Sequence, residues 1–200
     1  TRRSSDLSSM PGAELPLPRN PWNTDHITGG SSTGSGAAVA GGLCLGSLGE
    51  DTAGSIRNPS AFCGIAGLKA TYGRVSRHGL APLSWSLDHC GPMARAVEDL
   101  AHMLNALAGY DGNDPTSSAQ PVVDYTSALS GDVKGMVIGV PRDYIDECAP
   151  RTDPIVLRRV DEAIAQLKAL GARIEEIKVP TLHLATIANA VIYYNEFWAA

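Results

Sequence analysis

Apolar residues in the second half of this 200-residue chain repeat every three or four positions in two stretches. The first, residues 96–108, keeps its apolar side chains on one helical face and ends at Gly109, which is typical of an amphipathic helix and its stop signal. The second follows Asp153, a helix-capping residue, has Pro154 at its first position and ends at Gly171. We therefore predict helices over 96–108 and 154–170, the latter with a buried apolar face.

Shorter apolar runs predict strands. A run over 136–140 and an alternating run over 173–179 flank the predicted helix 154–170, and this order predicts a parallel pair joined by a right-handed crossover. Weaker patterns predict a buried strand over 43–48, a turn and strand over 67–76, and a helix over 182–200. Residues 1–28 hold several prolines and little periodicity, so we expect an extended loop that Trp22 anchors in the core.

Glycines and small hydroxyl residues gather in two clusters, 29–36 and 51–57, and small apolar residues between them predict a closely packed helix over 34–42. Ser31 lies in the first cluster and Ser55 in the second, 24 positions later. Glycine lets a ligand approach the backbone, so a serine in such a loop can present its hydroxyl beside several N–H groups. A nucleophile beside an oxyanion hole has this arrangement. The plainer interpretation is that each cluster only forms a turn, and two clusters around one helix argue against it.

Composition narrows the class of protein. With 44% apolar residues and a mean hydropathy of −0.05, the chain is typical of a soluble globular protein. No apolar stretch reaches about 18 residues, so we expect no membrane-spanning helix and no membrane partner. A net charge of −5 without a basic run argues against a nucleic-acid partner. The four cysteines form no C-x-x-C pair, which argues against a zinc site and favours a reducing, cytoplasmic setting.

Three motifs, in this order and spacing, identify a family. The segments GGSSTGSGAAVAGG, GEDTAGSIRNPSAFCGIAGLKATYGRVSRHG and SLDHCGPMARAVEDLA closely resemble the amidase signature family, and the resemblance extends over residues 20–109. It implies an α/β fold with a mixed β-sheet sandwiched by α-helices. We accordingly divide the chain into a leading loop (1–28), a signature core (29–109) and a βαβ-like continuation (132–200).

The resemblance also implies roles for individual residues. Ser55 would be the nucleophile and Ser31 a bridging serine on a cis peptide bond, with a lysine as the base. The oxyanion hole would consist of the backbone N–H groups of Thr52, Ala53, Gly54 and Ser55. Many members have glycine where Ala53 stands. Supporting or substrate-binding roles would fall to Gly30, Ser32, Asp51 and Arg57, and for Arg57 a structural salt bridge is the plainer interpretation.

With these groups the family hydrolyses a carboxylic amide to an acid and ammonia or an amine, through a serine acyl-enzyme. The resemblance implies neither a metal nor an organic cofactor. It implies a small-molecule amide as substrate and leaves a homodimer open as the assembly. Within the family, the alternative is the amidase subunit of a glutamine-dependent tRNA amidotransferase.

The position of the lysine departs from the family pattern. The family places its base well upstream of the bridging serine, whereas residues 1–30 contain no lysine. The lysines of the chain are Lys69, Lys134, Lys168 and Lys178. We therefore expect an internal portion of an amidase domain, which is inactive when isolated.

Three interpretations from other classes stay open. Gly-rich loops before helices can bind phosphates, but the chain has no G-x-x-x-x-G-K-[ST] motif for a nucleotide-binding module. Residues 30–34 match G-x-S-x-G, which would make Ser32 the nucleophile of a Ser-His-Asp hydrolase with Asp88 and either His78 or His89; against this, no buried strand precedes the motif. If Ser32 is not the nucleophile, we expect Asp88 to be a structural carboxylate or one that supports the site. The third interpretation is a folded fragment without catalysis.

Overall fold

The computed structural model describes residues 18–199, and the chain divides into two compact units. The larger unit contains residues 1–129 and 191–200, and the smaller unit contains residues 130–190. Within the described residues, no helix is long and apolar enough to cross a membrane.

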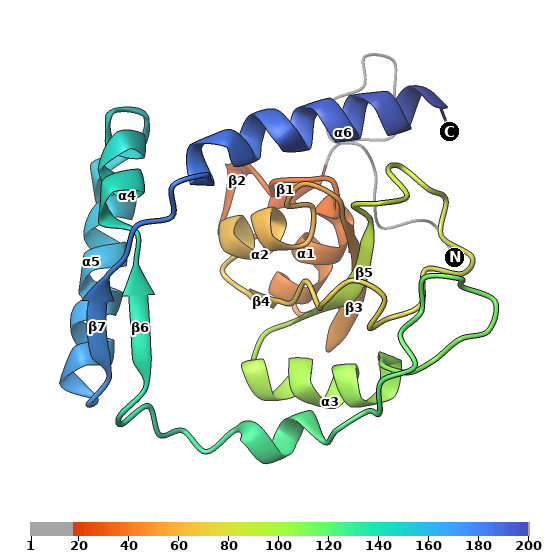
Figure 1. Ribbon diagram of the computed structural model, residues 1–200, viewed down its shortest axis with the longest axis horizontal. Coiled ribbons are helices and arrows are strands. Elements are labelled where there is room, and N and C mark those ends of the chain that lie inside the picture. The colour runs from red at the N-terminus through yellow and green to blue at the C-terminus, as the bar shows by residue number, and fades with distance from the viewer. Residues whose placement is uncertain (1–17, 200) are drawn as a thin grey trace. The chain divides into compact units, whose positions relative to one another are not determined.

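A three-stranded antiparallel sheet forms the centre of the larger unit (Figure 1). Its strands are β3 (Gly46–Asp51), β5 (His89–Ala94) and β4 (Ala66–Gly67), in the order β3-β5-β4. The register pairs Gly46 with Ala94 at one end of β3 and Asp51 with His89 at the other. The second Gly-Ser cluster therefore begins where β3 ends.

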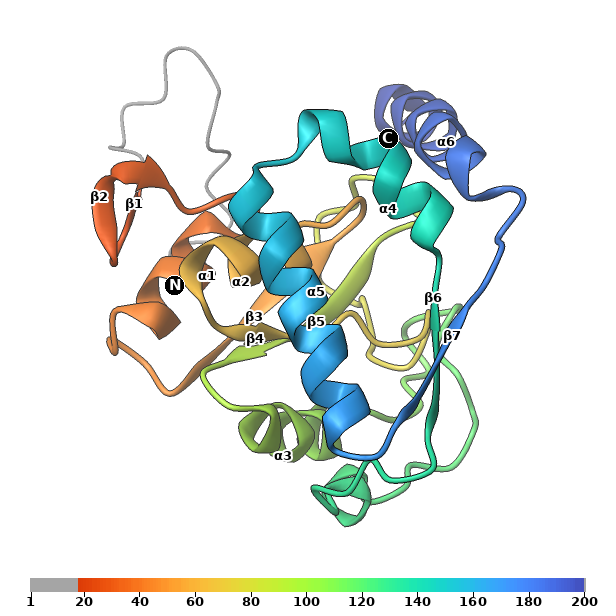
Figure 2. The same cartoon turned by 90° about the vertical axis from the view of Figure 1, so that its left-hand side faces the viewer.

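Three helices pack on this sheet. Helices α1 (Thr33–Ala40) and α2 (Arg57–Cys63) lie against each other, and α3 (Val97–Leu107) lies near the end of the sheet where β5 leaves it (Figures 1 and 2). A Cβ atom on Gly36 would stand 3.2 Å from Pro59 Cβ, so the small residues of α1 permit a close approach of α2, as predicted. Fully buried Val39, Ile56 and Met93 come from α1, the turn before α2, and β5.

The smaller unit is a strand–helix–strand element. Strands β6 (Val137–Val140) and β7 (Arg173–Glu176) pair in parallel, and α5 (Pro154–Ala169) packs against β7. Asp153 caps α5 by accepting a hydrogen bond from the N–H of Ile155 at 2.8 Å. The parallel pair and the capped helix are confirmed. The prediction that the apolar face of α5 is buried was wrong for this chain: Ile155 on that face is 56% exposed.

Short elements complete the chain. A hairpin of β1 (Arg19–Asn20) and β2 (Asn23–Ile27) precedes the sheet, and the larger unit also contains the 3-10 helix Tyr125–Ala128, which lies against α3. In the smaller unit, α4 (Arg142–Cys148) continues into the 3-10 helix Ala149–Arg151. The chain continues through the 3-10 helix Leu182–Leu184 into α6 (Ala185–Ala199). The architecture is α/β as expected, with the antiparallel and parallel strands in separate sheets.

Several local predictions were wrong. Residues 19–27, expected to be an extended loop, form the β1–β2 hairpin, and the rest of that prediction, residues 1–17, lies outside the described residues. Trp22 is 74% exposed at the hairpin turn, where its Nε1–H donates to the Cys63 carbonyl at 2.7 Å instead of entering the core. The strand expected over 43–48 begins only at Gly46, since Leu43 and Leu45 are exposed. Of the strand expected over 67–76, only a single bridge from Val75 to Ala108 forms beyond β4.

Candidate active site

The two Gly-Ser clusters meet in space. The N–H of Ser32 donates a hydrogen bond to the carbonyl oxygen of Ser55 at 3.2 Å, which joins the loop before α1 to the loop before α2. The Gly30–Ser31 peptide bond is cis, as the family resemblance implies. Ser31 and Ser55 are both partly exposed, so solvent reaches the two serines that the sequence singled out.

Asp51 organises the loop of Ser55. Its side chain is fully buried, and its two carboxylate oxygens accept hydrogen bonds from the N–H groups of Gly54 at 2.7 Å, Ile56 at 3.1 Å and Arg57 at 3.3 Å. The Arg57 guanidinium adds a bidentate ion pair, with Nε and Nη2 each 2.9 Å from a carboxylate oxygen. Burial raises the pKa of Asp51, but the bonds from Arg57, Gly54 and Ile56 outweigh it and hold the pKa below its usual value. The ionised carboxylate therefore folds residues 51–57 around itself, with Ser55 inside the turn.

This geometry bears on the expected oxyanion hole. Gly54 directs its N–H to Asp51 Oδ1, so this amide serves the loop itself. Thr52 is anchored on its other side, where its hydroxyl donates to Asp88 Oδ1 at 2.5 Å. Asp88 is 2% exposed, and its Oδ2 accepts the N–H groups of Leu83 and Ser84 at 2.8 and 2.9 Å. Asp88 is thus a structural carboxylate, and it reaches the loop of Ser55 directly.

Ser32 lies differently from Ser31 and Ser55. It is 1% exposed, its hydroxyl donates to the Glu50 carbonyl at 3.3 Å, and it accepts the Glu50 N–H at 3.2 Å. Among residues 18–199, the side-chain hydrogen bonds of Ser32 and Asp88 run to backbone groups and Thr52, and not to His78 or His89. This arrangement does not assemble a Ser-His-Asp triad around Ser32.

Lys69 contacts a histidine. Its Nζ is 3.2 Å from His89 Nε2, while His89 Nδ1 is 2.6 Å from the Leu87 carbonyl oxygen. Nδ1 therefore carries the donated proton and Nε2 accepts from Lys69. Burial lowers the pKa of His89, with a further contribution from Lys69, which keeps the imidazole neutral. Lys69, which follows β4 in the GLK segment, thus has a partner at the start of β5.

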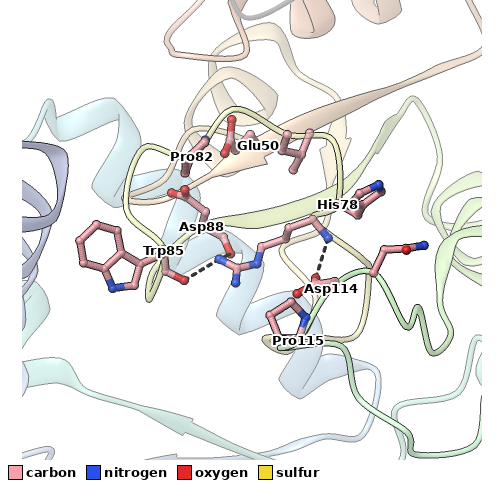
Figure 3. A pocket seen from close by; sticks show the side chains of 10 residues that line it. Glu50, His78, Pro82, Trp85, Asp88, Asp114 and Pro115 are labelled. Atoms are coloured by element: carbon pink, nitrogen blue, oxygen red, sulfur yellow. Dashed lines mark hydrogen bonds between the residues drawn. The ribbon is translucent and has the colours of Figure 1, made fainter. Parts of the chain in front are cut away.

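A cavity of about 210 Å³ opens beside Asp88 (Figure 3). Its lining includes Trp85, Asp88 and Asp114, and Figure 3 shows these side chains around one hollow. Arg77, which sequence reasoning passed over, is held there by the Trp85 carbonyl at 2.6 Å and the hydroxyl of Thr116 at 2.9 Å. The loop of Asp88 therefore forms a wall of this cavity as well as a support for Thr52.

The family follows from a direct comparison. The model of the amidase family matches residues 13–200, and the chain belongs to this family. The chain is 49% identical over 185 residues to the A subunit of glutamyl-tRNA(Gln) amidotransferase from Desulforamulus reducens, covering 92% of this chain and 38% of the relative. The crystal structure of the same subunit from Thermotoga maritima superposes with a TM-score of 0.87 at 38% identity, covering 92% of this chain and 40% of that one. The peptide amidase of Stenotrophomonas maltophilia gives a TM-score of 0.77 at 37% identity, covering 90% and 37%.

These comparisons confirm the amidase signature resemblance and the α/β fold, and the chain spans about two fifths of the length of these relatives. Of the predicted set, the structure joins Ser32 to Ser55, and Asp51 to Gly54 and Arg57. Ser31 lies next to Ser32, after the cis peptide bond. It adds Asp88 as a direct neighbour of Thr52, a contact over 36 positions that no local pattern encodes.

Proposed function

We propose that the whole protein hydrolyses a carboxylic amide to an acid and ammonia or an amine, with Ser55 as the nucleophile. The observation that carries this proposal is the direct hydrogen bond between the loops of Ser31 and Ser55, because a relay of two serines needs those loops in contact. Membership of the amidase family supports the same reaction.

The proposed steps use the groups described above. Ser55 Oγ attacks the amide carbonyl carbon, and its proton passes through the Ser31 hydroxyl to a neutral lysine, whose pKa desolvation lowers. The N–H groups of Thr52, Ala53 and Ser55 stabilise the oxyanion, while Gly54, Asp51 and Arg57 hold the loop in shape. The lysine proton goes to the leaving nitrogen as the C–N bond breaks. Water then cleaves the acyl-enzyme ester and regenerates Ser55.

Within this scheme Gly30 and Ser32 support the loop of Ser31. The lysine that the family resemblance implies lies upstream of Ser31, and residues 1–30 contain none. The substrate that we propose is a small amide. Four free thiols, two of them buried with burial raising the pKa of Cys63 and Cys90, support a reducing, cytoplasmic setting.

A second candidate function is the amidase subunit of a glutamine-dependent tRNA amidotransferase. The observation that favours it is the closer superposition on the Thermotoga maritima protein than on the peptide amidase, with TM-scores of 0.87 and 0.77. In that case glutamine is the amide and other subunits accompany this one, whereas a free-standing amidase works alone or as a homodimer. Ammonia release from glutamine, with the assembly measured by light scattering, separates the two candidates.

The test of the reaction is covalent labelling of the whole protein with a fluorophosphonate, followed by peptide mapping and an amide turnover assay. We expect the label on Ser55, and we expect Ser55→Ala to abolish both labelling and turnover. The exposed Ser130, changed to alanine, is the matched control. A label on Ser32 would instead favour the Ser-His-Asp hydrolase, and neither label nor turnover would favour a fragment without catalysis.

A further inference from the structure

A continuous hydrogen-bonded chain joins α6 to the loop of Ser55. At one end, Glu196 accepts the Ser84 hydroxyl at 2.5 Å through Oε2. The N–H of Ser84 then donates to Asp88 Oδ2 at 2.9 Å, and Asp88 Oδ1 accepts the Thr52 hydroxyl at 2.5 Å. Glu196 therefore reaches Thr52 through two intervening residues, although it lies 112 positions from Ser84 in the sequence.

The Glu196 carboxylate is firmly bound at its end. Its Oε2 also accepts the Ser86 N–H at 3.0 Å, and its Oε1 accepts the Ser86 hydroxyl. Burial raises the pKa of Glu196, but the bonds from Ser84 and Ser86 outweigh it, so the pKa lies below its usual value. Hydrogen bonds to an ionised carboxylate are stronger than those between neutral groups. Residues of the segment 83–86 thus donate hydrogen bonds to two carboxylates, those of Asp88 and Glu196.

The residues in the middle of this series of hydrogen bonds, Ser84 and Asp88, are buried. Ser84 is 0% exposed and Asp88 is 2% exposed, so water does not replace these contacts when one of them is lost. A bond lost in a dry, low-dielectric region leaves its partner unsatisfied, and the cost is relieved by movement of the backbone. The residue at the other end of these hydrogen bonds is Thr52, which directly follows Asp51 in the loop of Ser55.

We propose that Asp88 and Glu196 are positioning residues that fix the Thr52 N–H in the oxyanion hole, Asp88 directly and Glu196 through Ser84. This inference rests on the proposed amidase function. A side-chain anchor on Thr52 sets the direction of its backbone N–H, and a donor helps only if it points to where the oxyanion forms. Asp88 also lines the cavity of Figure 3. The hydrogen bond between Thr52 and Asp88 therefore connects the wall of this cavity to the loop of Ser55.

The expected effect is on kcat and not on KM. Removing one oxyanion donor outright costs about 10²–10³ in kcat, and loosening a donor costs less, about ten-fold. Because the oxyanion forms only in the transition state, the substrate binds as before. A purely structural role would instead lower the thermal midpoint and leave the kcat of the folded fraction unchanged.

The test compares three variants of the whole protein with a control. Thr52→Val keeps the shape but loses the hydroxyl, and we expect kcat to fall about ten-fold with KM unchanged. Thr52→Ser restores the hydroxyl and is expected to recover most of the lost kcat. Glu196→Gln removes the charge at the far end and is expected to lower kcat by a smaller factor. Glu98→Gln, an exposed glutamate in the first turn of α3, is the control and should change neither quantity.

The outcomes separate this inference from the proposed function. If turnover requires Ser55 but Thr52→Val and Glu196→Gln match the control, the positioning role is wrong and the amidase function stands. If Thr52→Ser is as slow as Thr52→Val, the hydroxyl is not what matters, and the inference is equally wrong. Turnover that survives Ser55→Ala would overturn the proposed function and this inference together. Thermal midpoints and far-UV circular dichroism show whether each variant is folded.

Discussion

The carboxylate of Asp51 and the guanidinium of Arg57 form a bidentate ion pair, with both N–O distances at 2.9 Å. The pair is asymmetric, because the Asp51 side chain is fully buried and the Arg57 side chain is 53% exposed. Asp51 also accepts backbone N–H groups of the intervening loop, so its carboxylate is more deeply involved in the fold than the guanidinium is. Arg57 is therefore the structural salt-bridge partner that the plainer interpretation of the sequence expected.

We predict that Asp51→Asn lowers the free energy of unfolding by about 2–3 kcal/mol at pH 7, since hydrogen bonds to a buried charge are worth more than neutral ones. The folded-state pKa of Asp51 lies below its ordinary 3.8, so its stabilisation is present above that pH and is lost as the pH falls through the folded-state pKa. Urea unfolding at pH 7, 5 and 3 should show the gap between wild type and variant narrowing only below about pH 4.

Arg57→Gln should lower the free energy of unfolding less than Asp51→Asn does, because the Arg57 side chain is 53% exposed. Asp99→Asn, at an exposed position in α3, is the matched control and should change the free energy of unfolding at pH 7 much less than Asp51→Asn does. A gap between wild type and Asp51→Asn that stays constant from pH 7 to pH 3 would contradict the assigned role.

The parts of the fold that the sequence predicts are those with strong local signals. Helix α3 has apolar residues at helical spacing before Gly109, and α5 has Asp153 and Pro154 at its start. Helix α2 was not predicted because seven residues are too few to show a period. Its signals were a proline in its first turn and Gly64, which has a left-handed backbone, after its end.

In the site, too, the features predicted from the sequence are those with local signals. The two Gly-Ser clusters are local patterns, and the hydrogen bond from the Ser32 N–H to the Ser55 carbonyl oxygen brings them together, while the catalytic roles of Ser31 and Ser55 stay a prediction. Strand β5 contains Gly91 and Pro92, which disfavour strands in a local analysis, yet it is the central strand. Glu196 was missed because its partners lie more than a hundred positions away, and its only local signal is a single acid in an apolar helix.

A second prediction concerns Ser32. Ser32→Ala removes a buried hydroxyl that donates to the Glu50 carbonyl oxygen and accepts from the Glu50 N–H. Its loss should lower the free energy of unfolding by about 1 kcal/mol. Turnover should persist, because the proposed nucleophile is Ser55. Ser35→Ala removes a comparable buried hydroxyl, which bonds to the Leu48 carbonyl at 2.7 Å, and provides the control for stability. Equal loss of turnover in Ser32→Ala and Ser55→Ala, with both variants folded, would leave the choice of nucleophile unsupported.

A third prediction tests the centre of the sheet. A Cβ atom on Gly91 would stand 2.2 Å from the carbonyl oxygen of Leu68, a backbone atom that cannot turn away. Gly91→Ala should therefore lower the free energy of unfolding by about 1–3 kcal/mol or more. At Gly112 the nearest atoms are 3.9 Å away, in the ring of Tyr110, so Gly112→Ala should be neutral or slightly stabilising. Urea unfolding of the two variants decides, and equal stability of both would contradict the close approach of strand β5 to residue 68.

The last prediction concerns the base. A lysine that accepts the serine proton must be neutral and close to Ser31, whereas Lys69 directs its Nζ to His89 Nε2 at 3.2 Å. Lys69→Met in the whole protein should therefore keep the greater part of its turnover. The polypeptide of residues 1–200 by itself should turn over little amide, because Ser55 without a base is a weak nucleophile and the oxyanion hole alone gives only residual catalysis. A segment upstream of Ser31 that supplies a lysine should restore turnover, and alanine in place of that lysine should remove it again. If residues 1–200 alone turn over amide robustly and Ser55→Ala abolishes this turnover, the base lies among these residues. If Lys69→Met then also abolishes the turnover, Lys69 is that base.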